Sequence, residues 1–159
     1  MYKRILVPTD GSPIATQAGD AALQLARACG SEIVALSVAF PEAFLGGAER
    51  GLVSGAGPQV DRMLAEAEGR AAAVAARAQA AGLASETLAT YSLSPGDAII
   101  DAARERQCDL IVMGSHGAGG LTGKIAGSVT QHVLAYAAAP VMVLRPPRAD
   151  AAVSVAAGF

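Results

Sequence analysis

The apolar residues of this chain form short continuous runs, separated by longer segments in which apolar positions recur every three or four residues. Four of the runs are rich in Val, Ile and Leu, which is typical of strands that are covered on both faces. They lie at residues 3–9, 32–39, 108–114 and 140–145. A fifth, more polar segment at 83–93 predicts a strand at the edge of the sheet.

Helical spacing dominates the segments between these runs. Small and apolar residues recur at that spacing from Ala18 to Cys29, and Gly30 stands where a glycine commonly ends a helix. Residues 58–81 open with proline, are rich in Ala, Arg and Glu, and are followed by glycine, which predicts a long helix.

Two further helices are expected in the second half of the chain. Ser94 as N-cap, Pro95 as first residue and Asp97 as third residue predict a helix over 94–107. The last helix is predicted to begin near Ser128.

Strands that alternate with helices of this length imply right-handed crossovers and a parallel sheet. The fold class is therefore α/β, an open doubly wound sheet with helices on both faces. Ligands of such sheets bind beyond the carboxyl ends of the strands, where the strand order reverses. The segments to inspect are 8–12, 38–41 and 113–117.

Composition narrows the function classes. The 159 residues suit one domain, and 52% apolar against 16% charged residues exclude a disordered chain. The net charge of −2 supplies no positive field for nucleic acid. No segment is long and apolar enough to span a membrane, and the apolar stretch before Pro8 is shorter than that of a secretory signal, so we expect a cytoplasmic protein.

Three features stand apart from the strand and helix pattern. The connection at 40–58 is long and glycine-rich. It is either a mobile flap near a site or a long linker without a function of its own. The segment at 146–159 is expected to be a flexible tail. Cys29 and Cys108 lack metal-site or redox spacing and are expected to be reduced, half-buried thiols.

The segment GSHGAGGLTGKIAGSVT at 114–130 concentrates glycines after a predicted strand and before a predicted helix. Bare backbone at that place lets N–H groups approach a phosphate, and the helix N-terminus adds free amides and partial positive charge. Glycines also permit ordinary tight turns, and Ser128 with Gln131 forms a capping box that needs no ligand. Composition alone leaves both interpretations open.

The predicted capping box satisfies only two of the free amides. It leaves the N–H groups of Gly127 and Val129 available to a phosphate, and the hydroxyls of Ser128 and Thr130 can add hydrogen bonds. Known nucleotide motifs do not fit: GGLTGKI is one residue short of a Walker A ending, with Ile125 in place of Ser or Thr, and no GxGxxG follows the first strand.

The spacing Gly114-x2-Gly117-x9-Gly127-Ser128 matches the ATP-binding signature of the universal stress protein family, and ILVPTDGS resembles that family's first strand and acidic turn. The resemblance runs from about residue 2 to residue 145. It implies a five-stranded parallel sheet in the order 3-2-1-4-5, of the adenine nucleotide alpha hydrolase-like type, in one nucleotide-binding domain over residues 1–145.

The resemblance also implies the site. Asp10 would contact the ribose hydroxyls, Pro8 and Thr9 would shape the wall, and the backbone of Val38 would meet adenine. The phosphates would be surrounded by Gly114, Gly117, Gly127, Ser128, Val129 and Thr130. ATP is the expected ligand, with ADP or AMP as alternatives and Mg²⁺ accompanying the phosphates. A carboxylate suits ribose hydroxyls and repels phosphate, which is consistent with this assignment.

Other interpretations of single residues remain. Asp10 also fits an Asx turn that only shapes the loop. Residues 118–120 carry no cation, which leaves Lys124 as the only one in the glycine segment, so the sequence supports binding of the nucleoside better than binding of a terminal phosphate. His116 has no orienting partner in the sequence and is not expected to be catalytic, and His132 is expected to be peripheral.

The pattern favours binding over turnover, because neither a nucleophile and base pair nor a metal cluster is evident. We expect an ATP-binding stress-response module, with slow ATP hydrolysis or autophosphorylation and a nucleotide-free interaction protein as alternatives. A flavodoxin-like module is disfavoured, because its phosphate loop follows the first strand, where only Gly11 stands. The apolar strand at 140–145 would be an exposed edge of the sheet, and proteins usually cover or pair such edges. The resemblance implies a homodimer joined through this strand. A further protein partner is expected, and its identity is unknown.

Overall fold

The computed structural model describes residues 1–41, 56–116 and 126–146. Most of the predicted flap at 40–58, the site residue Gly117, Lys124 and residues 147–159 of the predicted tail lie outside these ranges.

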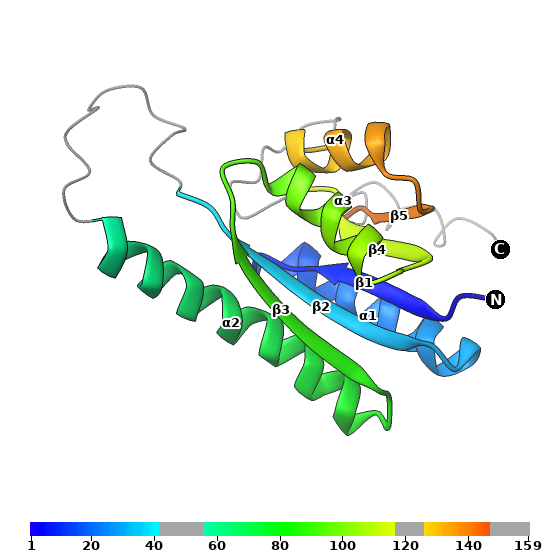
Figure 1. Cartoon of the computed structure of the whole chain (residues 1–159). Helices are drawn as coiled ribbons and strands as arrows, with labels where there is room; N and C mark the ends of the chain where they lie inside the picture. The colour runs from blue at the N-terminus through cyan, green and yellow to red at the C-terminus, as the bar shows by residue number, and fades with distance from the viewer. Residues whose placement is uncertain (42–55, 117–125, 147–159) are drawn as a thin grey trace, which may run out of the picture.

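A five-stranded parallel sheet in the order β3-β2-β1-β4-β5 forms the centre of the structure (Figure 1). The strands are β1 (Arg4–Pro8), β2 (Glu32–Ala39), β3 (Ser85–Tyr91), β4 (Leu110–Gly114) and β5 (Val141–Leu144). The predicted fold class and strand order are confirmed, and each strand falls within its predicted segment. The more polar β3 lies at one edge, and β5 lies at the other.

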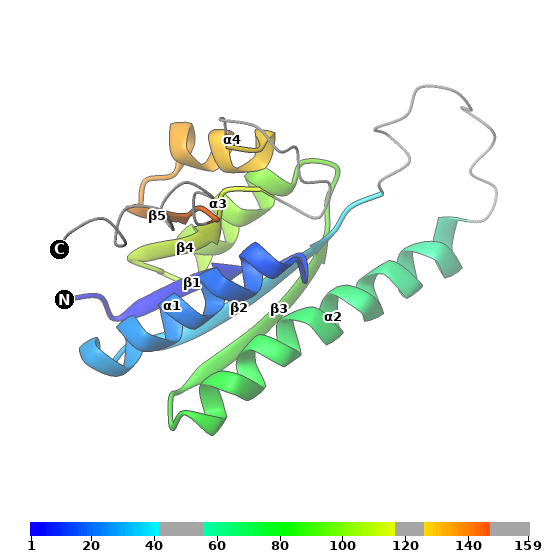
Figure 2. The same cartoon turned by 180° about the vertical axis from the view of Figure 1, so that it is seen from behind.

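Within the described residues, four helices cover the two faces of the sheet. They are α1 (Pro13–Cys29), α2 (Ala56–Ala80), α3 (Pro95–Glu105) and α4 (Ser128–Tyr136). The helices α3 and α4 pack on one face, and α1 and α2 pack on the other, as the view from behind shows (Figure 2). Among the described residues, no helix combines the length and apolarity that crossing a membrane requires.

Two apolar layers fix this arrangement, because successive strand residues point to opposite faces of the sheet. On β1, Ile5 and Val7 pack toward α1 and α2, whereas Leu6 packs toward α3 and α4, and all three are fully buried. Burial on both faces explains why the central strands read as continuous apolar runs rather than as alternating patterns.

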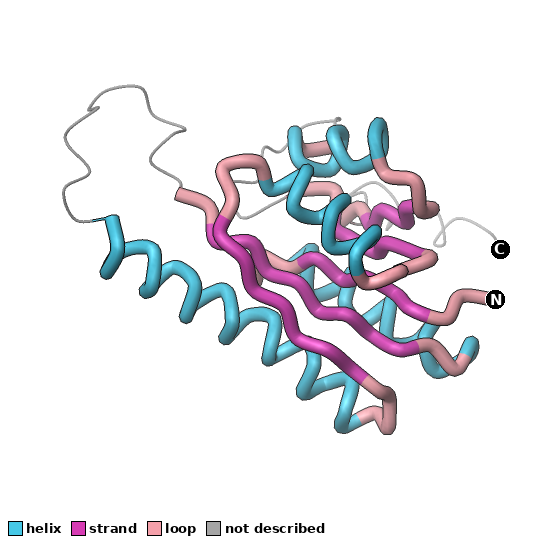
Figure 3. The backbone as a smooth tube through the Cα atoms, viewed as in Figure 1, coloured by secondary structure: helices cyan, strands magenta, loops and turns pink. Residues whose placement is uncertain are grey.

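Local sequence determines where the helices begin and end. Ser12 caps α1, and its hydroxyl accepts the N–H of Ala15 at 3.3 Å. Gly30 ends this helix in the left-handed region, with φ of 69°, as predicted. Ser94 is the N-cap of α3, but its hydroxyl donates to Asp97 Oδ2 at 2.6 Å instead of accepting a backbone N–H. The turns that follow β1, β3 and β4 all lie at the carboxyl end of the sheet (Figure 3).

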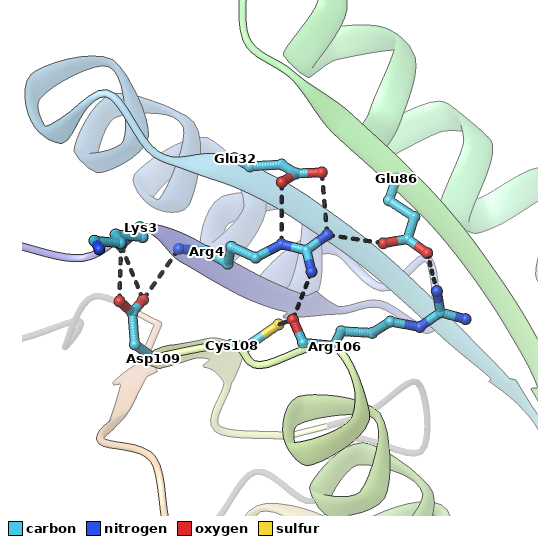
Figure 4. A network of polar contacts seen from close by, with 7 residues as sticks. All are labelled: Lys3, Arg4, Glu32, Glu86, Arg106, Cys108 and Asp109. Carbon is cyan, nitrogen blue, oxygen red and sulfur yellow. Dashed lines mark hydrogen bonds and ion pairs between the residues drawn. The ribbon is translucent and has the colours of Figure 1, made fainter.

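A polar network closes the opposite end of the sheet (Figure 4). The Arg4 guanidinium donates to Glu32 Oε1 at 3.2 Å, to Glu86 Oε2 at 3.0 Å and to the carbonyl of Arg106 at 2.6 Å. Arg106 also pairs with Glu86, and Asp109 accepts the backbone N–H of Arg4 at 3.1 Å. The network joins β1, β2, β3 and the start of β4, so the aminoterminal ends of the strands are tied together away from the predicted site.

Candidate functional site

A cleft of about 930 Å³ opens beyond the carboxyl ends of the strands. It lies between the ends of β1, β2 and β4, the beginnings of α3 and α4, and the first half of α2. Of the ten residues predicted for the site, nine line this cleft: Pro8, Thr9, Asp10, Val38, Gly114, Gly127, Ser128, Val129 and Thr130. The structure therefore brings together segments that are far apart in the sequence.

The turn between β1 and α1 carries the acidic residue of the cleft. The N–H of Thr9 donates to the carbonyl of Leu36 at 2.8 Å, which extends the sheet pairing by one residue. Asp10 is exposed, and its Oδ1 accepts the N–H of Ser12 at 2.9 Å. Gly11 has φ of 80°, a left-handed conformation that favours glycine. The Asx turn is thus present, and it occupies one carboxylate oxygen of Asp10.

Val38 lies near the end of β2, beyond the last residue that pairs with β1. Pairing between β1 and β2 ends with the hydrogen bond from Thr9 to Leu36, and Val38 comes two residues later, when the chain after β1 has turned toward α1. On its other side, β2 still pairs with β3 as far as Ala39. Backbone groups of Val38 on the β1 side therefore border the cleft, which suits the edge of a base.

The N-terminus of α4 differs from the prediction. The cap residue is Gly127 and not Ser128, and no side chain caps the helix, so the predicted capping box is wrong. The N–H of Gln131 donates to the carbonyl of Gly127 at 2.9 Å, and its side-chain amide donates to the carbonyl of Ala126 at 2.5 Å. The physical reason is the hydrogen bond from the Gly127 N–H to the carbonyl of Ser115, at 2.7 Å, which fixes the chain just before the helix.

This cap changes which amides face the cleft. The N–H of Gly127 is already bonded and is not available to a phosphate, contrary to the prediction. The N–H groups of Ser128, Val129 and Thr130 precede the first hydrogen bond of the helix and have no backbone partner among the described residues, so they offer donors at its positive end. The Thr130 hydroxyl is buried and donates to the carbonyl of Gly114 at 3.0 Å, so it holds α4 against β4.

Gly114 has a packing role of its own. A Cβ at this position would lie 3.0 Å from Ile14 Cγ2 and 3.2 Å from the carbonyl carbon of Ile14. The absence of a side chain therefore lets α1 approach the end of β4 closely, whatever ligand the cleft holds.

The two histidines both line the cleft. His116 Nδ1 lies 2.7 Å from the Ser115 hydroxyl, and its Nε2 is buried without a partner among the described residues. His132 is not peripheral, contrary to the prediction: its Nε2 lies 2.7 Å from Asp97 Oδ1, and its ring packs against Tyr136. No sequence pattern indicated this contact, because it joins residues on two different helices.

Two hydrogen bonds converge on the Asp97 carboxylate, one on each oxygen. The Ser94 hydroxyl and then His132 hold the pKa of Asp97 below its ordinary value. Ser94 and Asp97 lie at the start of α3, and His132 lies in the middle of α4, so this group connects the two helices whose first turns border the cleft.

One wall of the cleft was missed by the sequence reasoning. It comes from α2, whose residues Gln59, Met63, Glu66 and Arg70 line the cavity at the spacing of one helix face. Arg70 is the only lysine or arginine among the described residues of the lining. The available signal was a stripe of long side chains on a helix that is otherwise rich in alanine.

The strand order and a cleft at its switch point define an open α/β protein of the adenine nucleotide alpha hydrolase-like type. Comparison of the sequence with protein families matches residues 1–145 to the Universal stress protein family. The chain therefore belongs to the universal stress protein family.

Individual relatives agree with this assignment. Universal stress protein MJ0531 of Methanocaldococcus jannaschii is 31% identical over 152 residues, which cover 94% of this chain and 86% of the relative. The solved structure of hypothetical protein MJ0577 superposes with a TM-score of 0.79 at 25% identity, over 94% of this chain and 99% of that one. A universal stress protein solved in complex with cAMP gives a TM-score of 0.61 at 26% identity, over 91% of this chain and 97% of that one.

Proposed function

We propose that this chain binds an adenine nucleotide in the cleft, with ATP as the principal ligand and ADP or AMP as alternatives. The observation that carries the proposal is the meeting of three complementary groups in one cavity: the end of β2 at Val38, the carboxylate of Asp10, and the backbone amides of the first turn of α4. Binding of cAMP by a relative of this family supports the same ligand class.

Each group suits one part of the nucleotide. The backbone of Val38 offers a donor and an acceptor to the edge of adenine. The Asp10 carboxylate lies on the exposed turn after β1 and would accept hydrogen bonds from ribose hydroxyls. The N–H groups of Ser128, Val129 and Thr130 meet the phosphates at a helix N-terminus. Mg²⁺, where present, would be held by the phosphates themselves.

We propose binding and regulation rather than efficient turnover. The hydroxyl that faces His116 belongs to Ser115, which is 1% exposed and lies behind the lining of the cleft. The pair of Ser115 and His116 therefore presents no accessible hydroxyl to a substrate in the cavity. Nucleotide occupancy would instead change the surface that a protein partner reads during a stress response in the cytoplasm. The nucleotide-binding domain would span residues 1–145, with the following residues as a flexible tail.

We further propose that the chain forms a homodimer through β5. This strand lies at the edge of the sheet, and Met142 on it is 41% exposed. An edge strand of this kind offers unpaired backbone groups and apolar surface to a second copy. Light scattering should give the mass of a dimer, and Met142→Lys should shift the mass toward that of a monomer. A wild-type monomer at micromolar concentration would contradict the proposal.

Calorimetric titration with ATP tests the binding site, and Ser128 offers a sharp variant. Ser128 is the first residue of α4, and the extended backbone of Gly127 before it accommodates proline. Ser128→Pro removes one N–H without breaking the helix, whereas Ser128→Ala removes only the hydroxyl. We expect Ser128→Pro to weaken ATP about tenfold, consistent with the loss of one charge-assisted hydrogen bond, and Ser128→Ala to weaken it less. Adenosine binding should be unchanged in both.

Two results would contradict the proposal. The first is the absence of binding heat when ATP is added to the folded wild-type protein. The second is an equal ATP affinity of wild type and Ser128→Pro, which would place the phosphates away from α4.

A further inference from the structure

Arg70 lies beneath the acidic turn of the cleft. A Cβ added to Gly11 would lie 3.1 Å from Arg70 Cδ and 3.6 Å from its Cγ, so the aliphatic stem of the arginine packs against the backbone of the turn. The stem comes from α2, whereas the turn joins β1 to α1. Arg70 is thus a contact from a third element onto this turn.

The position of the arginine is itself fixed. Arg70 Nε donates to the Ser37 hydroxyl at 3.0 Å, and Ser37 is fully buried on β2. A long side chain normally has many rotamers, and this hydrogen bond selects among them. The hydrogen bond to Ser37 therefore fixes the guanidinium against the sheet, and this keeps the aliphatic stem of Arg70 beneath Gly11.

The middle of the turn is exposed, and local hydrogen bonds within it run from the Gly11 N–H to Thr9 Oγ1 and from the Ser12 N–H to Asp10 Oδ1. Its two ends are anchored, by Thr9 in the sheet and by Ser12 as the cap of α1. Asp10 and Gly11 between them are both exposed, and glycine restricts the backbone less than any other residue. Removing the Arg70 stem would leave space under the part of the turn that carries the Asp10 carboxylate.

We propose that Arg70 is a positioning residue for the ribose end of the site. It holds the turn from Asp10 to Gly11 so that the carboxylate meets the ribose hydroxyls, and it thereby sets the preference for a ribonucleotide over a 2′-deoxyribonucleotide. This inference rests on the proposed function, because it assigns the ribose to Asp10. Arg70 acts through the turn and not by binding the phosphates, which we place at the start of α4.

An alternative role for Arg70, the binding of an anion in a neighbouring groove, is less well supported. A second cavity, of about 540 Å³, lies between α1 and α2 and is lined by Arg70, Arg77 and Glu66. Arg77 is already paired with Asp20, and Glu66 offsets the charge of Arg70. The groove therefore has no excess positive charge for an anion, which leaves the support of the turn as the role that the contacts favour.

The test compares Arg70→Met with Arg77→Met, which removes a cation from the same helix but lies outside the lining of the nucleotide cleft. The affinities of ATP and 2′-deoxy-ATP are measured for wild type and both variants. We expect wild type to prefer ATP by roughly tenfold, the value of one hydrogen bond to a charged group. Arg70→Met should reduce this preference to less than about threefold, and Arg77→Met should retain it. Ser37→Ala, which keeps the arginine and removes its anchor, should give an intermediate ratio.

A second readout needs no nucleotide. The amides of Gly11 and Ser12 donate to Thr9 Oγ1 and Asp10 Oδ1, so their hydrogen exchange reports the order of the turn. In the nucleotide-free protein, exchange of both amides should accelerate in Arg70→Met and stay unchanged in Arg77→Met. An unaltered preference for ATP, or unaltered exchange of these amides, in folded Arg70→Met would overturn the inference. Failure of wild type to bind ATP would instead refute the proposed function, and the exchange rates would still decide whether Arg70 orders the turn.

Discussion

His132 Nε2 lies 2.7 Å from Asp97 Oδ1, so a side chain of α4 is bound to a side chain of α3 beside the candidate nucleotide cleft. The Ser94 hydroxyl holds the other carboxylate oxygen at 2.6 Å. The Asp97 carboxylate therefore joins the first turn of α3 to the middle of α4.

This contact predicts a specific dependence of stability on pH. The hydrogen bonds from Ser94 and His132 lower the pKa of Asp97 in the folded state, so the stabilisation is complete above the ordinary carboxyl pKa and is lost as the pH falls through the folded value. Urea midpoints of wild type and Asp97→Asn should therefore converge between about pH 5 and pH 2. Midpoints that differ by the same amount at every pH would show that the carboxylate charge does not matter.

The close packing of α3 against α4 at Gly96 predicts that a side chain at this position destabilises the protein. A Cβ at this position would lie 2.6 Å from His132 Cδ2 and 3.1 Å from its Cβ, so Gly96→Ala must displace the histidine. We expect the variant to lower the free energy of unfolding by about 1–3 kcal/mol. Gly69→Ala is the matched control, because its Cβ in the middle of α2 would meet no atom within 4 Å. It should raise stability by roughly 0.5–1 kcal/mol, and the opposite order of the two variants in urea would contradict the packing.

The Arg4 network predicts that replacing Arg4 lowers the free energy of unfolding much more than replacing Arg104. Arg4→Met leaves Glu32, Glu86 and a carbonyl without their shared donor in a partly buried place, and should cost about 1–3 kcal/mol of unfolding free energy. Arg104→Met removes an ion pair to Asp101 on the surface and should cost less than about 0.5 kcal/mol. Equal losses in chemical denaturation would mean that the network contributes no more than an exposed pair.

The two thiols should differ in reactivity. Both cysteines are free, as expected; Cys29 is half-buried, but Cys108 is more buried than predicted. Burial raises the pKa of Cys108 to about 11, so little thiolate forms at pH 8. Iodoacetamide at pH 8 should therefore modify Cys29 first, and Cys108 only after denaturant is added. Rapid alkylation of Cys108 in the native protein, detected by peptide mass spectrometry, would contradict its burial.

The sequence predicted the fold well because its signals are local and agree with one another. The continuous apolar runs reflect burial on both faces, and Ser12, Gly30 and Pro95 mark helix ends by their own backbone preferences. The spacing of glycines then identified the family and, with it, the strand order. These features depend on few tertiary contacts.

The errors arose where a tertiary contact decides the local structure. Ser128 has the residue type of an N-cap, but the hydrogen bond between Gly127 and Ser115 moves the cap back by one residue. His132 was expected to be peripheral and Arg70 was not singled out, because their partners Asp97 and Ser37 lie on other elements. A pattern read along one segment cannot reveal a site wall that a distant helix supplies.

A crystal structure of the protein with ATP would show whether the cleft holds an adenine nucleotide with its phosphates at the start of α4. We expect adenine beside the backbone of Val38, ribose hydroxyls on the Asp10 carboxylate, and phosphate oxygens within hydrogen-bond distance of the amides of residues 128–130. A nucleotide bound elsewhere, or an empty cleft at saturating ATP, would contradict it.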